Sequence, residues 1–258
     1  MERANVLGVG VNAIDIGRAA DRIDCALASG ERGYVCVTGV HGVMEAQNDP
    51  EFKTILNHSL LTVPDGMPTV WVGKLQGFRS MKRVFGPDLM AEVCARSVQK
   101  SYTHFLYGGA PGVAEQLQCA LLSRFPGINV VGIYTPPFRP LNELEFRQLK
   151  DMVAELNPDL FWVGLSTPKQ EQFMAANIQR LSTKVMIGVG AAFDIHTGRL
   201  RDAPDWVKNF GLQWVHRLIQ EPTRLWKRYL KNNPKFVWMV ALQLAGTTSA
   251  SQTKEIEL

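Results

Sequence analysis

The chain has 258 residues, of which 46% are hydrophobic and 20% are charged, and its formal net charge at pH 7 is +4. This length allows one large domain or two small ones with a sizeable buried core, and the composition is that of an ordinary globular protein. The apolar runs fall short of the roughly 18 residues that a membrane-spanning helix needs. The N-terminus also lacks the pattern of a secretory signal. We therefore expect neither an integral membrane protein nor a secreted one.

The positive charge is concentrated towards the C-terminal end. Between Arg199 and Lys235 there are nine lysines and arginines against three acidic residues, so this segment is +6 and the remainder of the chain is −2. This asymmetry predicts an anionic partner for the segment. Nucleic acid, an anionic membrane surface and a diphosphate ligand all fit the charge.

The four cysteines lie far apart in the sequence and lack the spacing of a zinc site. They are Cys25, Cys36, Cys94 and Cys119. We predict that all four are reduced core residues of a cytosolic protein.

The first three quarters of the chain alternate between apolar runs and amphipathic segments. The predicted strands are 6–11, 33–38, 60–63, 103–107, 129–134, 160–165 and 185–189. The predicted helices are 14–28, 43–47, 50–59, one opened by Pro68, 87–100, 111–125, 143–156 and 168–181, and 74–86 is predicted to be a loop. This alternation predicts an α/β fold, with a parallel Rossmann-like sheet core and helices on both faces.

After Gly198 the pattern changes to helices in which tryptophans and basic residues are interleaved. We predict three parts: an α/β catalytic core over 1–198, a helical, basic appendage over 199–246, and a polar, disordered tail over 247–258. If the appendage is one continuous helix, the spacing of Arg217, Arg224 and Arg228 places them on one face. Such a face is either a solvated basic surface or a binding surface for an anion or a membrane.

The polar turns after the last two predicted strands hold candidate ligand-binding residues. Ligands bind beyond the carboxyl ends of the strands of an open parallel sheet. This rule places Lys169, Gln170, Glu171 and Asp194 beside one crevice. Ser166, Thr167 and Pro168 are predicted to cap and open the helix that carries the first three; Asp194 either caps a turn or binds a ribose.

Asp65 follows a predicted strand, between Pro64 and Gly66. That context alone is typical of a turn aspartate. The same position also leaves a carboxylate reachable at the sheet edge, where it can act as a general base. Arg83 lies in a basic loop and is either solvated, paired with Asp88, or available to grip a phosphate at two points.

Gly108 and Gly109 lie between a strand end and a helix N-terminus. Such a turn is either a plain tight turn or a phosphate-binding turn, because helix N-termini offer unpaired N–H groups. Together with Gly112 the glycines do not form a dinucleotide fingerprint. Tyr134 ends its strand and is either a core residue or a platform on which a uracil base stacks.

A series of short motifs runs in order along most of the chain. The motifs are Val63–Gly66, Tyr107–Gly112, Val163–Leu165, Pro168–Glu171, Gly188–Ala191, Phe193–Asp194, Gly198, Ala203–Pro204, Trp206, Gly211–Trp214, Arg217–Leu218 and Glu221–Pro222. Any one of them is weak, but the ordered series is specific. It resembles the WecG/TagA/CpsF family of glycosyltransferases.

The resemblance implies an inverting glycosyltransferase that moves a sugar from a UDP-sugar to a polyprenyl-diphosphate-linked saccharide. It implies work in exopolysaccharide, teichoic acid or surface-antigen assembly, on the cytoplasmic face of the membrane, to which the basic appendage would attach peripherally. Asp65 is then the general base, and Arg83 stabilises the departing UDP. The substrate-binding residues that it suggests are Thr38, His41, Gly108, Gly109, Tyr134, Lys169, Gln170, Glu171, Asp194, Arg217, Arg224 and Arg228.

One departure from the family concerns the sugar site. The family commonly has Thr-x-Asn after the second predicted strand, whereas Thr38 is followed here by Gly39, Val40 and His41, with no asparagine. His41 is one candidate for that place, which leaves the sugar specificity open.

The sequence contains no Asp-x-Asp pair, the motif that many metal-dependent sugar transferases use, so neither a metal nor another cofactor is predicted. A homo-oligomer stays open, and no nucleic-acid partner is expected. Two other classes of function compete with glycosyl transfer. One is a nucleotide-dependent oxidoreductase, which the missing fingerprint weakens, and the other is a nucleic-acid-binding module that uses the basic C-terminal segment.

Overall fold

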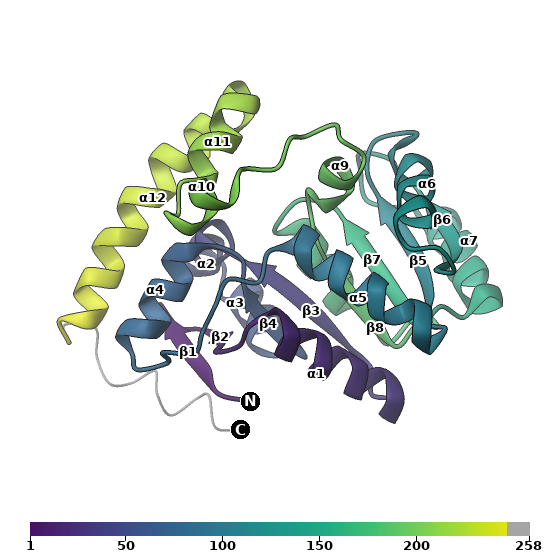
Figure 1. The fold of residues 1–258 in the computed structure, drawn as a ribbon, viewed down its shortest axis with the longest axis horizontal. Helices are drawn as coiled ribbons and strands as arrows, with labels where there is room; N and C mark the ends of the chain where they lie inside the picture. The colour runs from purple at the N-terminus through teal and green to yellow at the C-terminus, as the bar shows by residue number, and fades with distance from the viewer. Residues whose placement is uncertain (247–258) are drawn as a thin grey trace. The chain divides into compact units, whose positions relative to one another are not determined.

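The computed structural model describes residues 1–246, so the predicted disordered tail lies outside the described residues (Figure 1). The chain forms two compact units, each built from segments that are distant in the sequence. The first unit combines Met1–Asp15, Thr38–Val84 and the segment from Asp202 onward, and the second combines Ile16–Val37 and Phe85–Arg201. The division into functional parts at residue 198 stays a prediction.

The predicted parallel sheet is confirmed. It has six strands in the order β4-β3-β8-β7-β5-β6. The strands are β3 (Gly33–Thr38), β4 (Leu61–Pro64), β5 (Thr103–Gly108), β6 (Asn129–Tyr134), β7 (Leu160–Gly164) and β8 (Val185–Gly188). In the second unit, neighbouring strands run parallel, with Trp162 of β7 opposite Leu106 of β5 and Ile187 of β8. These central strands are buried along almost their whole length, so both faces need a cover of helices.

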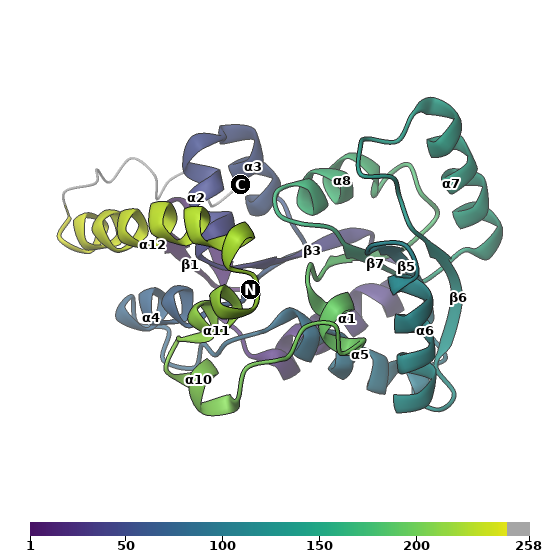
Figure 2. The same cartoon turned by 90° about the horizontal axis from the view of Figure 1, so that it is seen from above.

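Helices cover both faces of the strands in the second unit, as predicted. They are α1 (Ile16–Ser29), α5 (Gly86–Lys100), α6 (Val113–Arg124), α7 (Glu143–Leu156), α8 (Lys169–Asn177) and α9 (Ala192–His196). Figure 2 shows α7 and α8 on one face and α1, α5 and α6 on the other. Local sequence explains sharp starts such as that of α7, where Asn142 and Glu145 exchange side-chain bonds to each other's backbone N–H, both at 2.9 Å. The turns that lead from the strands into these helices lie at the carboxyl edge of the sheet, which is where open parallel sheets bind ligands.

The first unit begins with a hairpin that the sequence pattern does not reveal. The pattern predicts one strand over 6–11, but β1 (Arg3–Val6) and β2 (Val9–Asn12) pair antiparallel instead. Leu7 and Gly8 make the turn, with φ angles of 55° and 82°. Two positive φ angles are the geometry of the commonest two-residue hairpin turn. Leucine rarely occupies such a position, which is why the run reads as one strand.

The remaining elements of the first unit are the helices α2 (Val40–Asn48), α3 (Pro50–Asn57), α4 (Met67–Leu75), α10 (Asp205–Asn209), α11 (Gln213–Gln220) and α12 (Pro222–Leu244).

Glutamine side chains form hydrogen bonds with the backbone at the open edge of the hairpin. The Gln76 amide bonds both the N–H and the carbonyl of Asn5, at 2.9 and 2.6 Å. The Gln243 amide of α12 accepts from the N–H of Leu7 at 3.0 Å and donates to the Asn5 carbonyl at 2.8 Å. The C-terminal helix is thereby attached to the N-terminal hairpin.

The appendage is not one continuous helix, so the expectation of a single arginine face is wrong. Helix α11 ends at Gln220, and α12 starts with Pro222 in its first turn. Glu221, with φ of −132° and ψ of 57°, lies outside helical geometry between the two helices. Proline has no backbone N–H and a fixed φ, so it is favoured in the first turn of a helix, where Pro222 lies. Arg217 therefore lies on a different helix from Arg224.

The long helix α12 has an apolar stripe on its exposed side. Its exposed apolar side chains are Trp226, Leu230, Val237, Trp238 and Leu244. Lys227, Lys231 and Lys235 are also exposed. The buried apolar side chains, on a different side of the helix, are Leu225, Phe236 and Val240. The buried side packs on α2 and α11. Within residues 1–246, no helix is long and apolar enough to cross a membrane.

Two further expectations need correction. Helix α8 starts after Pro168 as its N-cap residue, with no side-chain cap, and ends at Asn177 rather than at 181. The Thr167 hydroxyl is directed to the Glu171 carboxylate instead of to the helix backbone, at 2.9 Å. Pro168 is therefore the residue before the helix and not its first residue.

The cysteines are free, as predicted, but only two of them are core residues. Cys36 and Cys94 are buried, whereas Cys25 and Cys119 are exposed. Burial raises the pKa of the Cys94 thiol to about 12. Cys94 is thus a protonated, unreactive packing residue at neutral pH.

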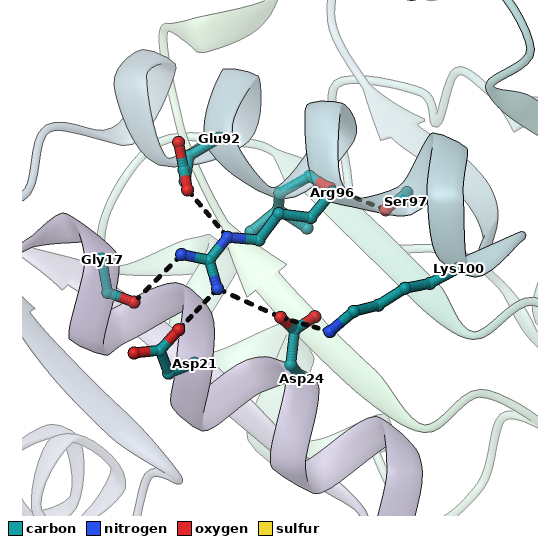
Figure 3. A network of polar contacts seen from close by, with 8 residues as sticks. Gly17, Asp21, Asp24, Glu92, Arg96, Ser97 and Lys100 are labelled. Atoms are coloured by element: carbon teal, nitrogen blue, oxygen red, sulfur yellow. Dashed lines mark hydrogen bonds and ion pairs between the residues drawn. The ribbon is translucent and has the colours of Figure 1, made fainter.

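A cluster of charged side chains joins α1 to α5 in the second unit (Figure 3). The guanidinium of Arg96 contacts Asp21 at 2.6 Å, Asp24 at 3.1 Å and Glu92 at 2.7 Å. It also donates to the Gly17 carbonyl at 3.5 Å. The ammonium of Lys100, also on α5, contacts Asp24 at 2.7 Å. Two cations of α5 thus compensate the two carboxylates of α1, which would otherwise repel each other at one turn's spacing.

Replacing Arg96 by methionine should lower the free energy of unfolding by about 1–2 kcal/mol, because charge-assisted bonds from a half-buried arginine are lost while its apolar stem is kept. The measurement is urea denaturation followed by circular dichroism. The control is Arg147→Met on the exposed surface of α7, which removes the same charge. The difference between Arg96→Met and the unmodified protein should shrink in 1 M salt. Equal urea midpoints for both variants would contradict the role assigned to the cluster.

Candidate functional site

Asp65 lies at the carboxyl end of β4, as predicted. Its backbone N–H donates to the Thr38 carbonyl at 3.1 Å, and the N–H of Val84 donates to the Pro64 carbonyl at 2.7 Å. These bonds fix the backbone around the half-buried Asp65 side chain. A β-carbon on Gly39 would lie 3.6 Å from Oδ2 of Asp65, so the glycine backbone borders the carboxylate directly. The hydroxyl of Thr38, beside this turn, is buried and has no hydrogen-bond partner.

Arg83 is held by the start of the C-terminal helices. Its Nη1 donates to Oε1 of Gln213 at 2.8 Å, and Gln213 is the first residue of α11. The contact joins residues that are 130 positions apart in the chain. A guanidinium has five N–H donors in one plane, so this type of group can bind an anion at more than one point.

His41 is directed to α12. Its Nδ1 lies 3.2 Å from the Asn232 amide nitrogen and 3.5 Å from Oε1 of Glu45. Asn232 is buried. Helix α12 thus supplies an asparagine that contacts His41 at the start of α2.

The three C-terminal arginines differ in their surroundings. Glu221, in the break between α11 and α12, binds Arg217 at 2.7 Å and Arg224 through both carboxylate oxygens, at 2.7 and 2.6 Å. Burial raises the pKa of Glu221, but hydrogen bonds from Arg224 and Arg217 lower it by more, so this pKa lies below its usual value. Glu221 therefore stays ionised at neutral pH and compensates one of the two positive charges.

Arg228 has a donor without an acceptor. Its guanidinium lies 5.6 Å from the ring of Tyr229, and its Nε is buried and makes no hydrogen bond. A buried N–H without a partner costs about 1–3 kcal/mol. An anionic ligand would remove that cost.

In the second unit, Gly108 and Gly109 form the turn after β5, with φ angles of 129° and 78°. The turn is closed by a bond from the N–H of Gly109 to the Gly164 carbonyl of β7, at 3.2 Å. A β-carbon on Gly108 would lie 2.6 Å from that same carbonyl oxygen. Glycine is required here because both the φ angle and the close backbone approach exclude a side chain. Helix α6 follows, with Gly112 as its N-cap residue.

Tyr134 belongs to an aromatic stack at the end of β6. Its ring is stacked on that of Tyr107, with centroids 5.8 Å apart, and Tyr107 stacks in turn on Phe173 at 4.5 Å. Tyr107 is buried, whereas Tyr134 is half-buried. Tyr134 is therefore a partly exposed ring at one end of this stack, and its position is compatible with both interpretations drawn from the sequence.

Gln170 and Glu171 lie side by side in the first turn of α8 and are buried, with 2% and 1% exposure. Oε1 of Glu171 accepts from Thr167 and from Nε2 of Gln170, both at 2.9 Å. Oε1 of Gln170 accepts from the N–H of Gly190 at 3.1 Å. The two side chains thus connect the turn after β7 to the turn after β8.

Lys169 precedes Gln170 in α8, and Asp194 follows the Gly190 turn in α9. Both side chains are more exposed to solvent than those of Gln170 and Glu171. Lys169 is exposed, and Asp194 is half-buried in the short helix α9. Oδ1 of Asp194 is 3.7 Å from Nε of Arg199. The Asp194 backbone carbonyl accepts from the N–H of Leu200 at 3.0 Å. Both interpretations of Asp194, a turn cap and a ribose ligand, stay predictions.

The candidate residues form two groups, one in each unit. Those in the first unit are Thr38, His41, Asp65, Arg83, Arg217, Arg224 and Arg228; those in the second are Gly108, Gly109, Tyr134, Lys169, Gln170, Glu171 and Asp194. Three residues hold these candidates in place: Gln213 contacts Arg83, Asn232 contacts His41, and Gly190 contacts Gln170. Gln213 and Gly190 belong to the ordered motifs, but the sequence predicts no contact for either, and Asn232 carries no signal of this kind. Two of these contacts join residues that are 130 and 191 positions apart and the third uses a backbone N–H, so local sequence does not reveal them.

Substituting Gly108 by alanine should lower the free energy of unfolding by at least about 3 kcal/mol, because strained backbone and a steric overlap add together. The matched control is Gly112→Ala, where φ is also positive at 82° but no atom lies within 4 Å of the added β-carbon. That variant should lose only about 1–2 kcal/mol. Urea denaturation of both proteins measures the difference. Equal losses would mean that the close approach of β5 to β7 does not constrain this turn.

The comparisons with known proteins agree with the order of the motifs. The sequence profile of the glycosyl transferase WecG/TagA/CpsF family matches residues 4–250. Two relatives, from Bacillus spizizenii strain W23 and Bacillus subtilis strain 168, bear the name N-acetylglucosaminyldiphosphoundecaprenol N-acetyl-beta-D-mannosaminyltransferase. They are 32% and 33% identical to this chain over 196 residues, which is 76% of this chain and 74% and 73% of theirs.

The profile spans nearly the whole described chain, and the relatives are similar over three quarters of it. This extent confirms the resemblance inferred from the motifs. It favours a glycosyltransferase over the alternatives of an oxidoreductase and a nucleic-acid-binding module. The chain belongs to the WecG/TagA/CpsF family of glycosyltransferases.

Proposed function

We propose that this protein transfers a sugar from a UDP-sugar to a polyprenyl-diphosphate-linked saccharide, with inversion at the anomeric carbon. The observation that carries the proposal is the Asp65 carboxylate at the end of β4, beside the unpartnered hydroxyl of Thr38, in a chain of this glycosyltransferase family. From the names of the two relatives we propose N-acetylmannosamine as the sugar and N-acetylglucosaminyl-diphosphoundecaprenol as the acceptor. The reaction would serve the assembly of a cell-surface polysaccharide.

In the proposed reaction, an acceptor hydroxyl attacks the anomeric carbon while the bond from that carbon to the β-phosphate oxygen of UDP breaks. The carboxylate of Asp65 accepts the hydroxyl proton. A single displacement of this kind places the new bond on the opposite face of the sugar, which gives inversion. The Gly39 backbone next to Asp65 favours the role, because a glycine adds no side chain between the carboxylate and an incoming hydroxyl.

The departing UDP carries negative charge that must be stabilised as the bond breaks. Arg83 and Arg228 are suited to this task. Arg83 is held in place by Gln213, and Arg228 has a buried Nε–H without an acceptor. Arg217 and Arg224 share Glu221, so they contribute a smaller net charge. We assign the direct phosphate contacts to Arg83 and Arg228, and a supporting role to the other two.

The second unit would bind the nucleotide. The turn at Gly108 and Gly109 and the N-terminus of α6 offer backbone N–H groups to phosphate. Tyr134 is a partly exposed ring at one end of its stack and would receive the uracil base. Asp194 would bind a ribose hydroxyl. Lys169, at the exposed start of α8, would add positive charge near the diphosphate.

The exposed stripe of α12 would attach the protein to the cytoplasmic face of the membrane, where a lipid-linked acceptor lies. Trp226 and Trp238 are 47% and 66% exposed, which is unusual for such large apolar side chains. Tryptophan favours the headgroup region of a bilayer, and lysines beside it meet anionic lipid. This arrangement supports peripheral attachment.

Replacing Asp65 by asparagine should abolish sugar transfer and leave the affinity for UDP within about threefold. The asparagine amide keeps the shape of the aspartate side chain but cannot take up a proton at neutral pH. Transfer is measured with UDP-N-acetylmannosamine and a short-chain N-acetylglucosaminyl-diphospholipid, and UDP binding by calorimetry. The control is Asp151→Asn on the exposed side of α7, which should keep full activity. Transfer by Asp65→Asn within threefold of the unmodified rate would exclude Asp65 as the base.

Replacing Lys231 and Lys235 together by glutamine should weaken binding to vesicles that contain anionic lipid by about 2 kcal/mol, or roughly 30-fold, since each lysine near such a surface contributes about 1 kcal/mol. The control removes equal charge from α7 through Arg147→Gln and Lys150→Gln. Vesicle co-sedimentation at several protein concentrations gives both affinities. If the two double variants bind equally well, α12 is not the membrane-facing element.

A further inference from the structure

Glu171 is a carboxylic acid in an almost completely enclosed position. Its side chain is 1% exposed, and its Oε1 accepts from Thr167 and Gln170. Its Oε2 is buried and has no hydrogen-bond partner among residues 1–246. Burial raises the pKa of Glu171, against the opposing effect of hydrogen bonds from Gln170 and Thr167. An apolar side chain of the same size would avoid this desolvation cost, so packing alone does not explain an acid at this position.

The neighbouring Gln170 amide can be held in only one orientation. Oε1 of Glu171 is the acceptor for the Thr167 hydroxyl, so the end of the Gln170 amide that contacts this oxygen must be a donor. The amide nitrogen of Gln170 therefore faces Glu171. The amide oxygen is then directed to the N–H of Gly190, at 3.1 Å. Rotating the amide by 180° would place two donors against each other at Gly190 and two acceptors against each other at Glu171. Glu171 therefore determines which end of Gln170 reaches the next turn.

Close packing at the end of β8 leaves Gln170 little other freedom. A β-carbon on Gly188 would lie 3.1 Å from Cδ of Gln170 and 2.8 Å from the terminal methyl group of Met174. The glycine thus makes the space that the amide occupies. Gly190 has a φ of 52°, and the turn leads directly into α9, which carries Asp194.

We infer that Glu171 is a positioning residue, whose acceptor oxygen orients the Gln170 amide and thereby fixes the Gly190 turn that presents Asp194. Glu171 itself does not touch the substrate. The sequence of contacts runs from Thr167 and Glu171 through Gln170 to the backbone of Gly190. The consequence for nucleotide binding rests on the proposed function, in which Asp194 binds the ribose of UDP.

The central variants are Glu171→Met, which keeps the size but removes the acceptor, and Glu171→Gln, which keeps an acceptor oxygen. The first readout is hydrogen exchange of the Gly190 N–H, which does not depend on any ligand. We expect protection of this N–H to fall at least tenfold in Glu171→Met and to stay within threefold in Glu171→Gln. Glu155→Met, on the exposed side of α7, is the control for the same chemical change and should leave Gly190 unaffected.

The second readout is UDP affinity by calorimetry, in a cycle with Gln170→Met. Glu171→Met should weaken UDP binding about tenfold, and Glu171→Gln should restore it to within threefold. If Glu171 acts through Gln170, the double variant Gln170→Met/Glu171→Met should bind UDP no more weakly than Gln170→Met alone. Thermal unfolding of each variant verifies that the fold is retained.

The two readouts separate the inference from the proposed function. If the unmodified protein does not bind UDP but the Gly190 N–H loses protection only in Glu171→Met, the proposed donor is wrong and the positioning role stands. If the Gly190 N–H is equally protected in Glu171→Met, the inference is overturned. It is also overturned if the effects of the two single variants on UDP affinity multiply in the double variant.

Discussion

The ends of three neighbouring strands in the second unit pack so closely that no β-carbon fits between them. At Gly108 the obstacle is the Gly164 carbonyl, at Gly164 it is the Phe193 ring, and at Gly188 it is the Gln170 side chain. Parallel strands buried on both faces bring their polar turns to one edge of the sheet, and this packing determines what fills that edge. Because the strands carry no side chain there, a buried amide and an aromatic ring from the following helices take the space. The candidate nucleotide-binding turns therefore depend on a steric constraint at the strand ends more than on any one polar contact.

The first unit is held by a different kind of interaction, in which side-chain amides complete bonds of distant backbone or side chains. Gln76 and Gln243 saturate the hairpin edge, Gln213 holds Arg83, and Asn232 contacts His41. An amide both donates and accepts, so it can replace a missing strand neighbour or fix a cation without adding charge. Charged residues of the unit bind backbone or one another, as Arg3 does at the Asn57 and Ser59 carbonyls and Glu221 does between two arginines.

The sequence predicts the fold well where periodicity is long and local. Residues 129–134 and 143–156 have the predicted bounds, and Asp65 lies at a strand end as its neighbours indicate. The errors occur where a tertiary contact overrides local preference. Leu7 accepts a left-handed φ because the hairpin is bound on its edge by other elements, and Thr167 binds Glu171 instead of capping the helix. Gln213 and Asn232, which contact Arg83 and His41, lie more than a hundred residues away from them, so local periodicity does not reveal these contacts.

The attachment of Gln243 to the N-terminal hairpin also constrains the order in which the first unit is completed during synthesis. The hairpin leaves the ribosome well before α12, but the side chain that bonds the Leu7 N–H comes from the end of α12. The second unit, whose last segment ends at Arg201, is available in full before that helix exists. Until residue 243 has been added, part of the hairpin edge keeps unpaired backbone groups of the kind that attract other strands. Helix α12 thus acts as a closure for the hairpin, which obtains its bonds to Gln243 only after that residue has been made.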